Sequence, residues 1–265
     1  MPFPVTHPAL DRALADRGYA EPTAVQAAVL EGDHSGSDLL VSAQTGSGKT
    51  VAFGLAAAPT LLGEAERFGK AGKPLALVIA PTRELALQVA TELTWLYAGT
   101  DAKLGTCVGG MDARKEARAL GWGTHIVIGT PGRLKDHIDR GNLDLSELKL
   151  VVLDEADEML DMGFREDLEF ILDQSPAGRR TLLFSATIAR EIAILAKRYQ
   201  RDAVRIDTTN KSQPHGDIEY RAMRIAPNQI EHAVVNVLRF FEAPGALVFC
   251  STRESVKHLQ AALRE

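Results

Sequence analysis

The sequence predicts an α/β protein whose mainly parallel sheet is flanked by helices. Short apolar runs alternate with helix-like spacing along the 265 residues. Most of the runs contain consecutive apolar residues, such as Leu150-Val151-Val152-Leu153, as expected for strands that are buried on both faces of a parallel sheet. Polar and glycine-rich motifs follow these runs. Because parallel strands end at one edge of a sheet, the motifs are expected to gather there, where α/β proteins bind ligands.

Composition limits the functional classes. Apolar content of 45% and charged content of 25% are typical of a globular protein. The net charge of -5 gives no global attraction to nucleic acid, so such binding requires a local basic patch. Cys107 and Cys250 lack metal-ligand spacing and are read as apolar residues of a reducing compartment. With no long apolar run and no signal peptide, we expect a cytoplasmic protein without a membrane segment.

Six apolar runs are expected to form the first sheet: 38–42, 75–80, 105–108, 125–129, 149–154 and 181–185. A helix is predicted to start near Thr82 and stop at Gly99, and its apolar face comprises Leu85, Val89, Leu93 and Leu96. Another helix is predicted over 186–199. The Gly-, Lys- and Glu-rich segment 63–72 indicates a surface loop.

The polar segment 208–216 indicates an interdomain linker. It precedes a second alternating unit with predicted strands at 218–225 and 246–250 and predicted helices at 229–241 and 253–264. This unit is short for an independent core. We therefore expect a complete domain at 1–206, a linker at 207–216 and an incomplete α/β unit at 217–265.

Residues 43–50, Ala-Gln-Thr-Gly-Ser-Gly-Lys-Thr, follow the first predicted strand. This spacing is typical of a phosphate-binding P-loop, although the general pattern has glycine where this chain has Ala43. The glycines let backbone N–H groups turn toward phosphate oxygens at a helix N-terminus. The alternative is a chance glycine-rich turn. The residues expected to bind nucleotide are Gln44, Thr45, Gly46, Ser47, Gly48, Lys49 and Thr50.

Two acidic residues mark the end of the predicted strand at 149–154: Asp154 is its last residue, and Glu155 follows it directly. Asp154 is expected to hold Mg²⁺ through the water that Mg²⁺ retains, and the Thr50 hydroxyl is expected to ligate the ion. Glu155 is placed to orient or deprotonate an attacking water. Lys49, Asp154 and Glu155 are thus the expected catalytic groups of Mg²⁺-dependent nucleoside triphosphate hydrolysis. The alternative is an acidic helix N-terminus that is favoured by the helix dipole.

These motifs, in this order and with the letters D-E-A-D at 154–157, resemble those of the DEAD-box ATP-dependent RNA helicases of bacterial type. Residues 1–206 resemble the first RecA-like domain of that family, and 217–265 the beginning of the second. Residues 18–26 resemble its Q motif. The resemblance implies that Gln26 hydrogen-bonds adenine with both halves of its amide, supported by Thr23. It also implies that Tyr19 or the upstream Phe3 packs on the base; for Tyr19, core packing is the alternative.

Three further motifs imply contacts to an RNA backbone: Ia (Pro81, Thr82, Arg83), GG (Gly109, Gly110) and Ib (Thr130, Pro131, Gly132, Arg133). Arginines can pair with phosphate, hydroxyls can donate to it and glycines allow close approach. None of these groups suits base edges, so binding is expected to be sequence-nonspecific and salt-dependent. Contacts to 2′-hydroxyls would favour RNA over DNA. The alternative role of each loop is a helix cap or turn.

Ser185-Ala186-Thr187 resembles motif III, whose hydroxyls bond the last carboxylate of the D-E-A-D tetrapeptide, here Asp157. The resemblance implies coupling between the nucleotide site and an interdomain cleft. Ser185 could also cap the following helix. Residues 247–252 resemble motif IV, after which the match ends with the chain. Because the arginine-bearing motifs V and VI are absent, we expect a fragment with little ATPase activity that can associate through its incomplete second unit.

The resemblance implies an ATP-dependent RNA helicase that unwinds short duplexes locally, coupled to Mg²⁺-ATP hydrolysis. Two alternatives stay open. One is an ATP-controlled RNA-binding clamp with little unwinding, and the other is a P-loop DNA helicase or translocase. Both use the same nucleotide site.

Overall fold

The computed structural model describes residues 3–4, 6–32, 34, 36–209, 219, 221–242 and 244–263. The chain divides into two units, Met1–Asn210 and Lys211–Glu265.

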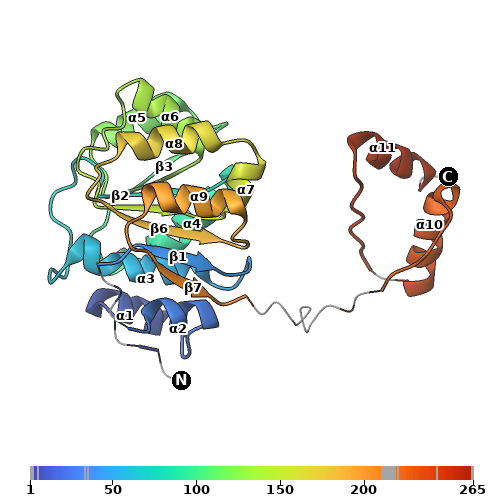
Figure 1. Ribbon diagram of the computed structural model, residues 1–265, viewed down its shortest axis with the longest axis horizontal. Helices are drawn as coiled ribbons and strands as arrows, with labels where there is room; N and C mark the ends of the chain where they lie inside the picture. Colours follow the sequence, from blue (N-terminus) through green and yellow to red (C-terminus); the bar gives the residue numbers. More distant parts are fainter. Residues whose placement is uncertain are drawn as a thin grey trace. The chain divides into compact units, whose positions relative to one another are not determined.

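The first unit is built on a seven-stranded parallel sheet with the order β3-β4-β2-β5-β6-β1-β7 (Figure 1). The strands are β1 (Leu39–Ser42), β2 (Ala76–Ile79), β3 (Leu104–Cys107), β4 (Ile126–Gly129), β5 (Leu150–Leu153), β6 (Arg180–Ser185) and β7 (Val204–Asp207). The predicted α/β class is therefore confirmed. All six predicted strands form, and β7 is an additional edge strand.

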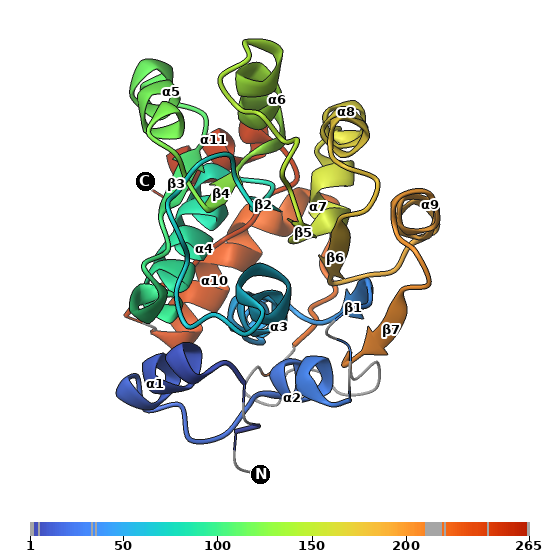
Figure 2. The ribbon, with the colours of Figure 1, turned by 90° about the vertical axis from the view of Figure 1, so that its left-hand side faces the viewer.

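Helices cover both faces of this sheet. They are α1 (Pro8–Asp16), α2 (Ala24–Leu30), α3 (Lys49–Leu62), α4 (Arg83–Leu96), α5 (Ala113–Gly121), α6 (Pro131–Asp139), α7 (Ala156–Asp161), α8 (Arg165–Gln174) and α9 (Arg190–Tyr199). Figure 2 shows α1 to α4 on one side of the sheet and α5 to α9 on the other. Alternate strand residues enter the two cores: Val78 and Val152 pack with the first group of helices, and Leu77 and Val151 with the second.

The predicted start of α4 is confirmed, because the Thr82 hydroxyl accepts a hydrogen bond from the Leu85 N–H at 3.2 Å. The helix ends at Leu96 and is followed by a 3₁₀ turn, Ala98–Thr100, which contains Gly99. The helix predicted to begin at residue 186 begins instead at Arg190, with Ala189 as its N-cap. The reason is that Thr187 bonds through its backbone and side chain to Asp157 rather than joining the helix.

The second unit contains a 3₁₀ turn, Pro227–Gln229, and two helices, α10 (Ile230–Phe241) and α11 (Arg253–Ala262). Both predicted helices therefore form. The predicted strands do not: 221–225 and 246–250 are irregular, and neither pairs with a strand in the described part of the chain. Without a partner, the backbone groups of an apolar run cannot form a ladder.

The expected linker, 207–216, lies mostly outside the described residues; Asp207 ends β7, and Thr208 and Thr209 follow it. Ile218, the first residue of the predicted strand, also lies outside them. Across the described ranges, none of the helices combines the length and apolar character required to cross a membrane.

Candidate functional site

All of the predicted site loops except the Q motif follow the carboxyl ends of strands, and they divide the sheet edge into two halves. The nucleotide-site segments follow β1, β5 and β6, which are adjacent in the sheet. The segments expected to contact RNA follow β2, β3 and β4, which form the neighbouring half. Because every strand pair is parallel, the sheet itself brings residues from distant parts of the sequence to one edge.

The P-loop requires glycine at two positions. Gly46 and Gly48 have φ angles of 79° and 90°, and Gly48 is the N-cap of α3. A Cβ atom at Gly48 would lie 2.6 Å from Nε2 of Gln26. The Ser47 hydroxyl donates to the Gln44 carbonyl at 2.6 Å, which closes the turn. The loop therefore has the left-handed backbone that directs N–H groups toward a bound anion.

Gln26 joins the Q motif to the P-loop. Its Oε1 accepts from the Thr23 N–H at 3.0 Å, and the Thr23 hydroxyl accepts from the Gln26 N–H at 3.4 Å, completing a capping box on α2. Its Nε2 donates to the Gly48 carbonyl at 3.2 Å. An amide has two donor hydrogens and two acceptor lone pairs, so each half of this buried side chain has capacity for one more hydrogen bond.

Tyr19 packs among other aromatic side chains. Its ring lies edge-on to Phe3, with 6.4 Å between the centroids, and 5.6 Å from the Trp95 ring. The guanidinium carbon of Arg17 lies over the Trp95 ring, 5.0 Å from the ring centroid. Phe3 and Tyr19 are thus neighbours that are partly buried against the core on this side of the sheet.

Lys49 and Glu155 form a buried ion pair between the P-loop and the segment after β5. Their side chains are 5% and 6% exposed, with Nζ and Oε1 2.8 Å apart. Lys49 also donates to the Ala43 carbonyl at 3.2 Å, and the Thr45 hydroxyl donates to the same Glu155 oxygen at 2.8 Å. Glu155 has a φ angle of 51°, a strained conformation for a non-glycine residue. The structure therefore brings the predicted phosphate-binding cation and the predicted base into direct contact.

The environment of the Asp154 carboxylate is suited to binding a metal ion. The residue is 2% exposed, and its Oδ1 has no hydrogen-bond partner within the described part of the protein. Burial raises the pKa of its carboxyl to about 7, against the opposing effect of the Lys49 charge. A buried carboxylate oxygen without a donor is unfavourable alone and is suited to a hard cation. Thr50, in the first turn of α3, is half-buried.

The structure brings Asp157, Ser185 and Thr187 together, but the two hydroxyls act differently. The N–H and hydroxyl of Thr187 both donate to Oδ2 of Asp157 at 2.9 Å. The Ser185 hydroxyl instead accepts from the Asp157 N–H at 3.3 Å and donates to the Thr187 carbonyl at 2.7 Å. Burial acts to raise the pKa of Asp157, but the hydrogen bonds with Thr187, Ser185 and Glu158 together outweigh it and the pKa is lowered. Ser185 does not cap α9.

The Ia and GG motifs lie in contact. Pro81 is buried and Thr82 caps α4, so Arg83 begins the helix. Nη1 of Arg83 donates to the Gly109 carbonyl at 3.4 Å. Gly110 has a φ angle of 77°, and a Cβ there would lie 2.7 Å from Nη1 of Arg83. Both glycines are exposed. The structure thus gives an exposed backbone beside a guanidinium.

Motif Ib begins α6, with Thr130 as its N-cap and Pro131 and Gly132 in its first turn. Arg133, expected to pair with phosphate, is turned inward: its side chain is 16% exposed. Its Nη1 lies 2.9 Å from Oε2 of Glu116, and it also donates to the Met111 carbonyl at 3.3 Å. Sequence reasoning missed Glu116. It lies in a charged helical segment beside Arg114 and Lys115, and no local pattern distinguishes it from a solvent-facing glutamate.

Comparison with known proteins gives the same family as the motifs. Residues 23–195 match the family described as DEAD/DEAH box helicase. The chain is 37% identical over 257 residues to "ATP-dependent RNA helicase DbpA" of Bacillus subtilis, covering 97% of this chain and 52% of that protein. It is 40% identical over 254 residues to "ATP-dependent RNA helicase DeaD" of Escherichia coli, covering 95% and 39%. The chain thus spans about half the length, or less, of these relatives.

Among solved structures, the crystal structure of a DEAD box protein from the hyperthermophile Methanococcus jannaschii aligns with a TM-score of 0.70 and 36% identity. The alignment covers 97% of this chain and 68% of that one. The parallel sheet and its flanking helices therefore have a counterpart in a solved DEAD box protein structure. The chain belongs to the DEAD/DEAH box helicase family.

Proposed function

We propose that the chain is the ATP- and RNA-binding part of an RNA helicase that uses Mg²⁺-ATP hydrolysis to separate short duplexes locally. The contact between Lys49 and Glu155 carries the proposal, because the proposed phosphate-binding cation and the proposed water-orienting carboxylate lie 2.8 Å apart. The family match and the printed names of the relatives support the use of ATP and RNA.

In the proposed reaction, incoming phosphates attract Lys49 away from Glu155 and bind the N–H groups around Gly46 and Gly48. Glu155 then orients or deprotonates the attacking water. Gln26 uses the remaining capacity of its amide to bind the adenine edge, which favours ATP over GTP. Asp154 and Thr50 would hold Mg²⁺, which supplies positive charge to neutralise the phosphates when it is bound.

The half of the sheet edge that follows β2, β3 and β4 is the proposed RNA side. Arg83 and the exposed Gly109–Gly110 backbone can contact phosphate and sugar, and no base-reading group is assigned there. We therefore propose binding that ignores sequence and weakens with salt. Asp157, Ser185 and Thr187 lie on the nucleotide side and are proposed to couple ATP binding to closure of an interdomain cleft.

We further propose that 1–206 form the nucleotide-binding domain, 207–216 the linker and 217–265 the start of a second RecA-like domain. The division at Asn210 and Lys211 supports this organisation. Because the chain spans about half the length of the relatives, residues 1–265 alone are proposed to bind ATP but hydrolyse it slowly, and to associate through the second unit. A cytoplasmic location follows from the proposed substrates.

A strand-displacement assay with a protein that also carries a complete second domain tests the function. The proposal expects displacement of a short RNA duplex that requires ATP and is lost in Glu155→Gln. RNA-stimulated ATP hydrolysis without displacement would favour the RNA-binding clamp. Equal stimulation of hydrolysis by DNA and RNA would favour a DNA-directed enzyme.

A further inference from the structure

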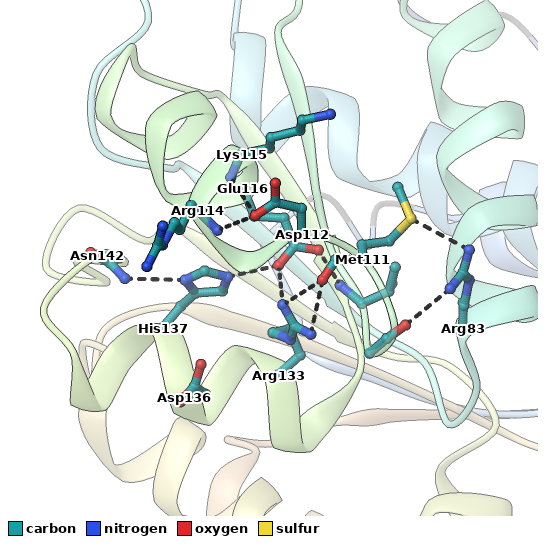
Figure 3. A network of polar contacts seen from close by, with 12 residues as sticks. Arg83, Met111, Asp112, Arg114, Lys115, Glu116, Arg133, Asp136, His137 and Asn142 are labelled. Atoms are coloured by element: carbon teal, nitrogen blue, oxygen red, sulfur yellow. Dashed lines mark hydrogen bonds and ion pairs between the residues drawn. The ribbon is translucent and has the colours of Figure 1, made fainter.

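Glu116, a residue of α5, places a buried carboxylate between two of the loops proposed to bind RNA. Its side chain is 7% exposed. Oε1 accepts from the Val108 N–H at 2.9 Å, directly before the Gly109–Gly110 pair. Oε2 lies 2.9 Å from Nη1 of Arg133 in the first turn of α6. A single carboxylate therefore bonds the loop after β3 to the loop after β4 (Figure 3).

Two arginines hold the same segment from opposite sides. Nη1 and Nη2 of Arg133 both donate to the Met111 carbonyl at 3.3 Å. Arg83 donates to the Gly109 carbonyl at 3.4 Å and lies 3.4 Å from the Met111 sulfur. Figure 3 shows the segment between the two guanidinium groups. The three RNA-facing loops thus form one hydrogen-bonded assembly with Glu116 as its buried member.

His137 completes the assembly. The ring is 0% exposed, and its Nε2 lies 2.8 Å from Oε2 of Glu116. Its Nδ1 faces Nδ2 of Asn142 at 3.4 Å. Both contacts are hydrogen bonds when Nε2 donates to Glu116 and Nδ1 accepts from Asn142. Glu116 therefore receives donors on both oxygens, and Arg133 neutralises its charge.

The same cluster has ligand atoms at metal-binding spacing, since those of Cys107, Glu116 and His137 lie within 4.8 Å of one another. Two observations oppose a metal ion. The guanidinium of Arg133 already occupies the Glu116 oxygen that His137 contacts. Burial also raises the pKa of the Cys107 thiol to about 12, so forming the thiolate that binds a metal ion is unfavourable at this position. We therefore interpret the cluster as a hydrogen-bond network centred on Glu116.

We propose that Glu116 is a positioning residue for RNA: it fixes Arg133 and the Gly109–Gly110 loop as one preformed backbone-binding surface and does not itself touch RNA. The inference rests on the proposed RNA-binding function. Glycine loops lose more conformational freedom on binding than other segments do, so a loop fixed beforehand binds with less entropic cost. The free energy of RNA binding therefore depends on a carboxylate that is buried beneath the surface.

The test measures the affinity of a fluorescent single-stranded oligouridylate for the chain by anisotropy, comparing Glu116→Gln with Glu147→Gln. Glu147 is exposed and precedes β5, at the opposite edge of the sheet, so its substitution is a matched change of charge. Removing a negative charge alone strengthens RNA binding slightly. We expect E147Q to show that small gain, whereas E116Q weakens binding about tenfold, the effect of one lost charge-assisted hydrogen bond.

A double-mutant cycle establishes the route of the effect. If Glu116 acts through Arg133, E116Q has little effect in an Arg133→Gln background, because the pair is already broken. ATP affinity without RNA stays unchanged in every variant, since the P-loop lies on the other half of the sheet edge. Equal weakening by E116Q in both backgrounds, or a parallel loss of ATP affinity, would overturn the inference.

Two controls keep the result interpretable. If E116Q lacks a cooperative unfolding transition, Arg133→Lys replaces it: lysine keeps the charge but cannot bond Glu116 and Met111 as a fork, so RNA affinity must still fall. Unchanged RNA affinity in R133K would then contradict the inference. Absence of RNA binding by the unsubstituted chain would instead overturn the proposed function itself, a result that is visible before any variant is compared.

Discussion

The Lys49 ammonium and the Glu155 carboxylate neutralise each other at 2.8 Å in the proposed nucleotide site. Each is a group that the proposed reaction needs elsewhere: Lys49 on phosphate and Glu155 on water. Nucleotide binding must therefore exchange one ionic contact for another. This exchange separates the expected effects of replacing the two residues.

Lys49→Ala is expected to weaken ATP binding by at least about tenfold, because a charge-assisted contact to phosphate is lost. It also leaves Glu155 buried without its cation, which adds charge repulsion toward phosphate. Titration with a fluorescent ATP analogue measures the change. ATP affinity within a factor of two of the unsubstituted chain would contradict the assignment of Lys49.

Glu155→Gln is expected to leave ATP affinity equal or slightly higher, since Lys49 no longer has a competing carboxylate. Hydrolysis by the protein with a complete second domain should fall by roughly 10²–10⁴, the usual contribution of a positioned general base. Single-turnover hydrolysis at saturating ATP separates the two effects. A matched fall in ATP affinity and in rate would show that Glu155 serves binding instead.

Gly48→Ala is expected to disturb the P-loop more than Gly46→Ala. Both positions have positive φ angles, which cost a non-glycine residue about 1–2 kcal/mol. A Cβ at Gly46 meets nothing within 4 Å, whereas one at Gly48 meets Gln26 Nε2 at 2.6 Å. The difference in unfolding free energy between the variants, measured in urea, isolates that clash. The clash would be excluded if both variants lost the same unfolding free energy. It would also be excluded if adding Gln26→Ala to Gly48→Ala restored no stability.

The lowered pKa of Asp157 predicts a pH-dependent role for Thr187. A carboxyl whose folded pKa is depressed stabilises the fold above its unfolded pKa, about 3.9, and loses that contribution as the pH falls through the folded value. Thr187→Val removes the hydroxyl bond to Asp157 and is expected to cost about 1 kcal/mol at pH 7. The cost should shrink below pH 4. Urea unfolding at both pH values checks this, and a pH-independent cost would contradict it.

The second unit is expected to exchange its amide hydrogens rapidly and to self-associate. Among the described residues, α10 has no buried side chain, and Phe249 is 91% exposed. Few buried contacts mean low local stability, and exposed apolar surface favours association. Hydrogen exchange and sedimentation measure the two properties. A monomer whose α10 amides are as protected as those of β5 would contradict this prediction.

The sequence was sufficient for β1 to β6 because each is an apolar run with chemically distinctive residues at its end. β7 escaped prediction because Val204 and Ile206 alternate with the exposed Arg205 at the sheet edge, so the segment resembles a surface loop. The run at 246–250 was apolar but forms no strand, since pairing depends on a distant partner and not on the run itself.

The residues of the candidate site also divide into those whose positions the sequence predicts and those whose positions it does not. Lys49, Asp154 and Glu155 could be located from motif spacing, because the backbone of a strand and the following turn fix their positions. The inward orientation of Arg133 could not, since it depends on Glu116, which lies 17 residues away in a different helix. The role of a buried carboxylate depends on such partners, which are distant in the sequence. The helical pattern of the segment around Glu116 does not predict them.

The hydrogen bond from Gln26 to the Gly48 carbonyl has a consequence for how a nucleotide is selected. In the proposed function, a base that bonds the Gln26 amide also acts on the turn proposed to bind the phosphates, so recognition of the base is coupled to phosphate binding through one side chain. Under this proposal, base selectivity and phosphate binding are therefore coupled through the same hydrogen bond. A substitution at Gln26 that lowers base selectivity is then expected to change the affinity for the phosphates as well.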